Sequence, residues 1–253
     1  MLLAGSIFVG VDPTAARKAF TYAALDRDLN LLELTEGESE EVLDFLAAQK
    51  AAFVAVNSPS QLNTGFLRRS QGGEGSTSHH MRGVEMRVAE HELRERGIPV
   101  SGTPAREALC SPWVRVGLRL YRVLAERGFE PYPADDCRFQ WLETHPHAAF
   151  CALLGRSPLS KAAVEGRLQR QLILHERGLR IHDPMNYFEE ITRHRLLNGV
   201  LPTEIVYLPE QLDALVAAYT AWVATEKQGE LTRLGNDEEG YISLPAAPLK
   251  DKY

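Results

Sequence analysis

The chain has 253 residues, 44% of them hydrophobic, and a formal net charge of −6. It can bury a sizeable core in one large or two small globular domains, and its negative charge disfavours a protein that coats nucleic acid with a generally basic surface. No apolar run approaches the ~20 residues that span a bilayer, and no basic segment precedes residues 1–4 as in a signal peptide. The three cysteines are too scattered for a zinc or disulfide framework. We therefore expect a cytoplasmic protein with no membrane partner.

The first predicted element is a buried strand that ends on an acid. The run from Ile7 to Val11 is β-branched and aromatic apart from Gly10, where the absence of a side chain lets a neighbouring strand or a ligand approach closely. Asp12 follows where the strand leaves the core, and Pro13 is expected to end the ladder because it has no amide hydrogen. Asp12 either opens an Asx-type turn or belongs to a metal or phosphate-directed site.

A hairpin, a helix and a second covered strand follow. Two short extended runs over residues 18–25 and 31–35 flank a polar turn, and residues 39–46 have the capping and spacing of an amphipathic helix. The apolar run 51–56 predicts a strand parallel to the first, because such a crossover needs a helix. Asn57 would then emerge beside Asp12 at the carboxyl edge of the sheet, where α/β proteins bind ligands.

The next part of the chain reads as an insertion, at about residues 60–135, into a single domain spanning residues 1–253. Residues 60–80 are rich in glycine and serine and predict a loop, which is either a plain surface loop or a substrate-gripping lid that carries Arg68 and Arg69. Charged amphipathic patterns predict helices over residues 81–97 and 113–127.

Three later segments contribute candidate site residues. The extended run 138–143 ends on Glu143, and a basic helix over 161–177 carries Lys161 and Arg167, which either form a solvated face or contact phosphate. The apolar helix 209–222 contains Asp213. A carboxylate in such a helix must be paired, protonated or metal-bound because burying it alone is very costly, although a role near the helix dipole remains the structural alternative.

The acids Asp12, Glu143 and Asp213, with the amide of Asn57, are therefore predicted to converge. Carboxylate and amide oxygens are hard ligands that suit Mg²⁺ or Mn²⁺. A pair of such ions ~3.5–4 Å apart can orient a water and stabilise both oxygens in phosphodiester cleavage.

The chain resembles the domain of unknown function 429 family of predicted nucleases, which have a ribonuclease H-like fold. The resemblance rests on segments spread nearly end to end: 8–12, 54–59, 81–82 with 90–97, 144–148, Lys161 with 166–167, 213–221 and 238–245. It implies an α/β fold with a ribonuclease H-like mixed sheet, in which three antiparallel strands are followed by parallel strands and flanked by helices.

The resemblance also implies a metal-dependent nuclease with Asp12, Glu143 and Asp213 as catalytic ligands for Mg²⁺ or Mn²⁺ and Asn57 as an auxiliary ligand. Arg68, Arg69, Lys161 and Arg167 are the candidate substrate-binding residues. The family usually has aspartate where this chain has Asn57, and an amide carries one negative charge fewer into a site that must hold divalent ions.

The leading hypothesis is thus a phosphodiesterase whose partner is nucleic acid. The main alternative is a binding or scaffolding protein that keeps the fold with a weakened site. A third possibility, a sugar or acetate kinase with this strand order, requires a second duplicated half with its own nucleotide-binding glycines, which this sequence lacks.

Overall fold

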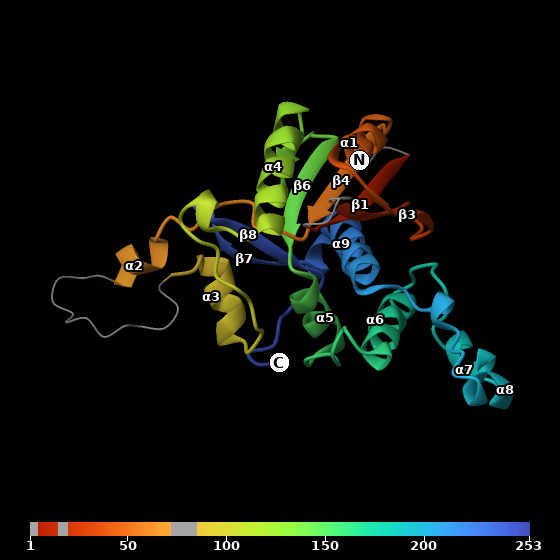
Figure 1. Ribbon diagram of the computed structural model, residues 1–253. Helices are drawn as coiled ribbons and strands as arrows, with labels where there is room; N and C mark the ends of the chain where they lie inside the picture. Colours follow the sequence, from red (N-terminus) through yellow and green to blue (C-terminus); the bar gives the residue numbers. More distant parts are fainter. Residues whose placement is uncertain (1–4, 15–19, 72–84) are drawn as a thin grey trace.

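A mixed β-sheet forms the centre of the molecule (Figure 1). The computed structural model describes residues 5–14, 20–71 and 85–253, and in this part of the chain the strand order is β3-β2-β1-β4-β6-β8-β7, with β5 paired to β6. The strands are β1 (Ser6–Pro13), β2 (Phe20–Leu25), β3 (Leu31–Gly37), β4 (Ala51–Val56), β5 (Glu130–Pro131), β6 (Phe139–Thr144), β7 (Thr232–Asn236) and β8 (Gly240–Leu244).

The pairing confirms the predicted fold class. Strands β1, β2 and β3 are antiparallel neighbours, whereas β4 lies parallel to β1 and β6 lies parallel to β4. As predicted, β1 ends at Pro13, which lies opposite Phe20 in the last pair of the ladder. Proline is tolerated there because residues of an antiparallel pair do not all exchange hydrogen bonds.

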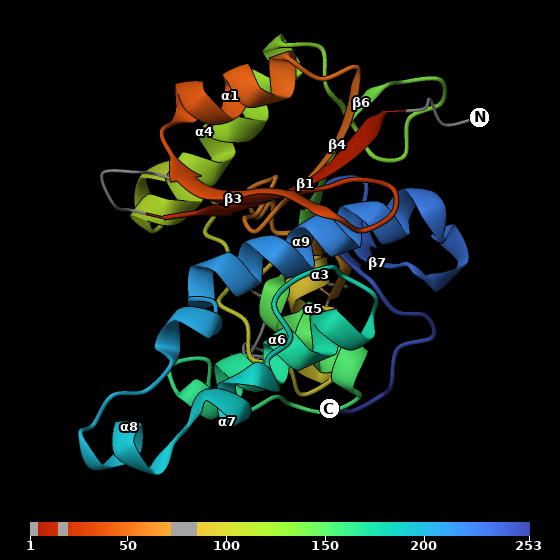
Figure 2. The ribbon, with the colours of Figure 1, turned by 90° about the vertical axis from the view of Figure 1, so that its right-hand side faces the viewer.

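Helices cover both faces of the sheet. Figure 2 shows α1 and α4 above the sheet and α9, with α3, α5 and α6, below it. The helices are α1 (Ser39–Ala47), α2 (Phe66–Gln71), α3 (Val88–Glu95), α4 (Pro112–Glu126), α5 (Pro146–Leu154), α6 (Val164–Glu176), α7 (Asn186–Glu190), α8 (Arg193–Leu197) and α9 (Pro209–Glu226), with short 3₁₀ turns at Glu107–Leu109, Thr203–Ile205 and Gln228–Glu230.

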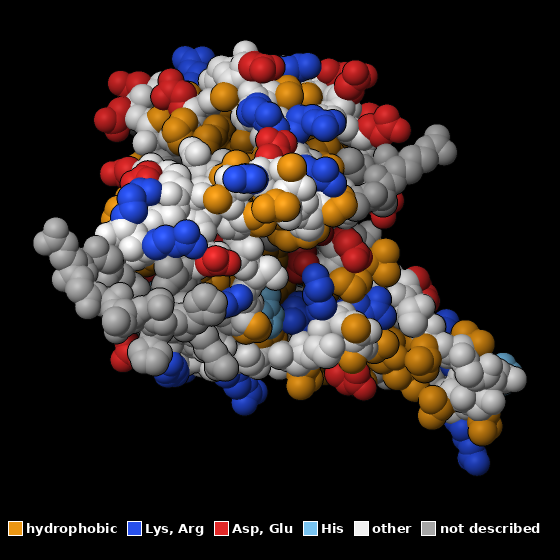
Figure 3. Space-filling model, turned by 60° about the vertical axis from the view of Figure 1, so that its left-hand side comes forward, with side chains coloured by type: hydrophobic (Ala, Val, Ile, Leu, Met, Phe, Trp, Pro, Cys, Tyr) orange, Lys and Arg blue, Asp and Glu red, His pale blue; other side chains and the backbone are white. Residues whose placement is uncertain are grey.

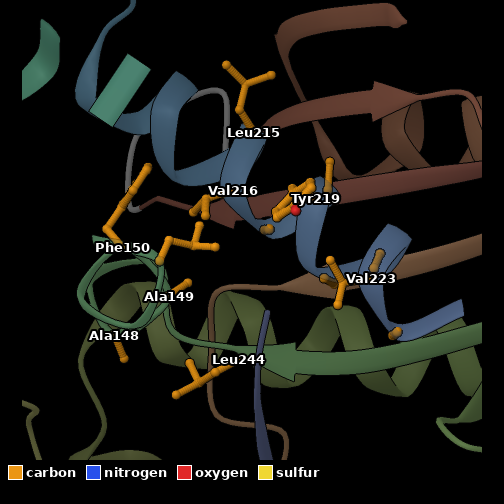
Figure 4. Packing of buried hydrophobic residues seen from close by; sticks show 14 of the residues in the cluster. Ala148, Ala149, Phe150, Leu215, Val216, Tyr219, Val223 and Leu244 are labelled. Atoms are coloured by element: carbon orange, nitrogen blue, oxygen red, sulfur yellow. The ribbon is translucent and has the colours of Figure 1, made fainter. Parts of the chain in front are cut away.

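The alternation of side chains along β1 divides the core into two layers. Val9 and Val11 pack toward α1 and α4 together with Val54 and Val56, whereas Phe8 packs toward α9. Below the sheet, α9 packs against α5 and the end of β8 through the residues shown in Figure 4.

The backbones of β1 and α9 meet at Gly10. A methyl group at this position would overlap the carbonyl oxygen of Ala214 and the amide nitrogen of Ala218. The sequence prediction that this glycine permits close approach is confirmed, but the approaching element is the small-residue face of α9 rather than a strand or a ligand. This contact fixes the distance between α9 and the end of β1.

Two regions differ from their sequence predictions. The segment expected as a helix over 81–97 lies partly outside the described residues, and α3 occupies Val88–Glu95. Helices α7 and α8, which the sequence analysis did not predict, project from the body as a short arm (Figures 1 and 2). Throughout the described residues, no helix combines the length and the apolar character needed to cross a membrane.

Candidate functional site

Asp12 and Asn57 meet at the carboxyl ends of β1 and β4. The backbone amide of Asn57 donates to the carbonyl oxygen of Val11, which continues the parallel ladder by one residue. This register brings the Asn57 side chain beside Asp12, and its Nδ2 donates a 2.6 Å hydrogen bond to Asp12 Oδ1. Asp12 is only 6% exposed, so its carboxylate lies in a largely dehydrated environment.

Asp213 approaches the same edge from the second turn of α9. It is 4% exposed, and its Oδ2 accepts a 2.6 Å hydrogen bond from Lys161 Nζ. The Lys161 side chain is 53% exposed, so this pair joins a buried acid to a base that reaches solvent. The packing of β1 against α9 at Gly10 sets Asp213 facing the end of the first strand.

The two aspartates influence each other electrostatically. Burial raises the pKa of Asp12 to about 7, and the charge of Asp213 adds to this rise, while the hydrogen bond from Asn57 and the charge of Lys161 oppose it. Burial also raises the pKa of Asp213 against the opposing ion pair with Lys161. Paired carboxylates with strongly raised pKa values in a partly open setting are typical of functional sites.

The sequence analysis assigned no role to two further side chains in this region, His145 and Arg170. His145 is the N-cap of α5, where its Nδ1 accepts a 3.2 Å hydrogen bond from the Ala148 amide, and burial lowers its pKa to about 4. Arg170 is buried, lies close enough to Asp213 to oppose its raised pKa, and donates to backbone carbonyls at Leu159 and Gly166. The sequence feature that could have pointed to His145 as a helix cap is its position between the end of β6 at Thr144 and Pro146, the first residue of α5.

The structure does not bring Glu143 to Asp12 and Asp213. Alternation along β6 puts Glu143 on the side of Trp141, whose ring packs against Tyr121 of α4, whereas Asp12 faces α9. Its two carboxylate oxygens accept hydrogen bonds from the guanidinium of buried Arg87, and Oε2 also accepts from the amide and hydroxyl of Ser60. Metal ligation by Glu143 stays a prediction that this placement does not support.

Arg87 is shared between two acids. Its Nε donates a 2.9 Å hydrogen bond to Glu90 Oε1, so one guanidinium bridges Glu90 and Glu143. All three side chains are 1–3% exposed. This cluster joins the start of α3 to the end of β6.

The other candidate substrate-binding residues lie apart from the aspartate pair. Arg68 and Arg69 lie on α2 at the outer edge of the molecule (Figure 1), where they pair with Glu85 and Glu238. Arg167 lies on α6, half-buried, and Lys161 alone of these four contacts a predicted site acid in the described part of the chain. Figure 3 shows a histidine, basic and acidic side chains around a hollow above the projecting arm.

The donor set fits a divalent ion that takes few protein ligands. Among residues 5–14, 20–71 and 85–253, no group of three or more His, Cys, Asp or Glu side chains is placed to hold a metal. Mg²⁺, however, is commonly held by one or two carboxylates and completes its shell with waters and substrate phosphates. Asp12 and Asp213 with the amide oxygen of Asn57 match that pattern, and burial, which raises the pKa of both acids, would be offset by a bound cation.

Comparison with known proteins supports one assignment. The sequence model of a family described as "Protein of unknown function (DUF429)" matches residues 10–240, which include Asp12, Asn57, Lys161 and Asp213. No curated protein and no solved structure matches the chain.

Proposed function

The chain belongs to the DUF429 family, and we propose that it is a divalent-metal-dependent nuclease that hydrolyses phosphodiester bonds of nucleic acid. The observation that carries the proposal is the buried pair of Asp12 and Asp213 at the carboxyl edge of the parallel strands. Two buried acids whose like charges repel each other are costly in the metal-free protein, and they lie at the edge where α/β sheets bind ligands.

In this proposal each residue has a separate task. Asp12 and Asp213 hold Mg²⁺ or Mn²⁺, and Asn57 offers its carbonyl oxygen as an auxiliary ligand. The bound ion would supply Lewis-acid polarisation of the phosphate and a water of lowered pKa. The half-exposed ammonium group of Lys161 leaves its ion pair with Asp213 and pairs with a phosphate oxygen of the substrate, whose negative charge it neutralises.

Incubation with labelled single-stranded, duplex, branched and hybrid substrates in Mg²⁺ or Mn²⁺ tests the proposal. We expect cleavage that is abolished by a chelator and reduced at least a hundredfold in Asp12→Asn and Asp213→Asn. Asp44→Asn is the matched control because it makes the same chemical change on an exposed part of α1, on the opposite face of the sheet. Equal activity in Asp12→Asn and Asp44→Asn would sink the assignment.

One observation favours a second candidate function, a non-catalytic binding or scaffolding protein. Both aspartates already have partners within the chain, since Asn57 donates to Asp12 and Lys161 donates to Asp213. Calorimetry with Mn²⁺ separates the two candidates, because the absence of binding at millimolar metal would favour the scaffold. In Asn57→Asp the site regains a third carboxylate, and a gain of cleavage in this variant alone would identify the natural site as weakened.

A further inference from the structure

A cavity of about 320 Å³ reaches Asn57, whose side chain is hydrogen-bonded to Asp12. Its walls come from the end of β4, the segment 100–104, the start of α4 and the end of β6, and both Asn57 and His145 line it. Because the Asn57 amide is hydrogen-bonded to Asp12, one side chain separates the cavity from the first aspartate of the pair. Its volume lies at the lower end of the range for small-molecule sites.

Two large apolar side chains on this wall are exposed to water. Leu109 is 70% exposed and Trp113 is 36% exposed, and both line the cavity. Exposed apolar surface inside a concave site indicates a ligand that covers it. An indole face in such a position favours a flat aromatic ligand, because offset stacking of rings adds to the burial of apolar area.

The polar part of the wall suits a ligand that is neutral at the buried end. Arg87, Glu90 and Glu143 line the inner wall but satisfy one another through hydrogen bonds, so they do not select a charged group. The exposed side chains of Ser101 and Ser111 lie on the same wall and can exchange hydrogen bonds with ring edges. Positive charge lies outside this wall, on Lys161 at the aspartate pair.

We propose that this cavity binds the base and sugar of one unpaired nucleotide, next to the phosphodiester at Asp12 and Asp213, so that the protein selects single-stranded or frayed nucleic acid. The inference rests on the proposed function and deepens it by naming the substrate class. A cavity of about 320 Å³ suits a single unstacked nucleotide, because a base that stays paired and stacked in a duplex is not free to enter a pocket.

Binding measured without cleavage tests the inference. The probes are a short labelled single-stranded oligonucleotide, its blunt-ended duplex and the same single strand with abasic sites, each titrated in chelator and followed by fluorescence anisotropy. We expect the single strand to bind at least tenfold more tightly than the duplex. Trp113→Ala should weaken single-strand binding by roughly five- to a hundredfold, as loss of one stacked base does, and Trp113→Phe should retain most of the affinity.

Leu109→Ala and Leu197→Ala form a matched control pair. Both truncate a strongly exposed leucine, but Leu109 lines the cavity and Leu197 lies on α8 of the projecting arm. Only Leu109→Ala should lower affinity for the single strand. This pair and the abasic probe keep the test decisive even if Trp113→Ala fails to fold.

The outcomes separate this inference from the nuclease proposal. Equal binding of duplex and single strand, or of abasic and intact single strand, would overturn the nucleotide pocket even if metal-dependent cleavage is found. Selective binding that depends on Trp113 without cleavage in any metal would support the pocket and contradict the nuclease. Loss of single-strand preference in Trp113→Ala with cleavage intact would support both.

Discussion

At the scale of single residues, Asp12 couples the stability of the fold to pH. Burial, assisted by the charge of Asp213, raises its pKa from 3.8 to about 7. The folded protein therefore holds this proton more tightly than the unfolded chain does. The resulting stabilisation is fully present below pH ~4 and is lost as the pH rises through about 7.

Wild-type protein in chelator should lose stability between about pH 4 and pH 7, and Asp12→Asn should lose much less. Each unit of pKa shift corresponds to about 1.4 kcal/mol, so the difference between the two proteins is on the order of a few kcal/mol. Urea unfolding at a series of pH values measures it. Parallel pH profiles for the two proteins would contradict the raised pKa of Asp12.

Substitution of Glu143 should lower the free energy of unfolding, whether or not Glu143 takes part in a reaction. Glu143→Ala leaves Arg87, 1% exposed, with Glu90 alone as its acidic partner, and should cost about 3–5 kcal/mol of unfolding free energy. The triple variant Arg87→Met with Glu90→Gln and Glu143→Leu should recover most of this loss, because no buried charge is left unpaired. Chemical denaturation of the wild type and the two variants measures both effects. A stable Glu143→Gln protein that has lost metal binding would instead identify Glu143 as a ligand.

At the scale of elements, the contact between β1 and α9 aligns the two halves of the site. Gly10→Ala should destabilise the protein by roughly 1–3 kcal/mol or more, because the new methyl group overlaps the backbone of α9 at Ala214 and Ala218. Gly229→Ala is the matched control, since an added methyl group there meets no described atom within 4 Å, and it should change stability by less than ~0.5 kcal/mol. Thermal unfolding compares them.

Gly10→Ala should also move Asp213 relative to Asp12 and shrink the pH dependence that the pair produces. The same urea series between about pH 4 and pH 7 reports this effect through the slope of stability against pH, separately from the overall loss of stability. An unchanged pH profile in a destabilised Gly10→Ala protein would show that the aspartates do not depend on this contact.

The sequence predicted most of the elements that position the site. The hairpin, the crossover helix and the strand at Ala51–Val56 follow from the spacing of hydrophobic residues and from the residue types in the turns. Asp213 was recognisable as an acid within an apolar helix. Strands β7 and β8 lacked a readable alternation, since each is five residues long and has glycine at or near an end. Local pattern alone did not specify these strands.

The position of Glu143 depends on strand register. The sequence analysis grouped Glu143 with Asp12 and Asn57 as polar side chains at strand ends, whereas the pairing puts Glu143 opposite Val56, one residue short of Asn57. A shift of one residue moves a side chain to the other face of a sheet. Register depends on partners distant in the chain, and so the convergence of Asp12 with Asp213 was foreseen while the separation of Glu143 was not.

At the scale of the whole molecule, the arm formed by α7 and α8 is the part most weakly joined to the body. Its helices are five residues each, and Phe188, Leu196 and Leu197 are more than half exposed. A small cluster of Leu168, Tyr187 and Val206 packs at its base, apart from the two main cores. Segments with few buried contacts open locally at low free-energy cost.

Limited trypsin digestion should therefore cut at Arg193 faster than at Arg119. Both side chains are exposed, but Arg119 lies on α4, which packs along the sheet, so the comparison isolates local opening. Mass spectrometry of early time points identifies the first cut. Earlier cleavage at Arg119 would show that the arm is held more firmly than its contacts indicate.

The distance along the chain between β1 and α9 also sets the order in which the site can exist during protein synthesis. Asp12 is made early, but its partner Asp213 and the helix that covers Gly10 leave the ribosome only after every other helix of the described chain. Until then the chain has no aspartate pair and no site for a divalent ion. Under the proposed function, a nascent chain is thus harmless to the messenger RNA from which it is being translated, and activity appears only when α9 docks.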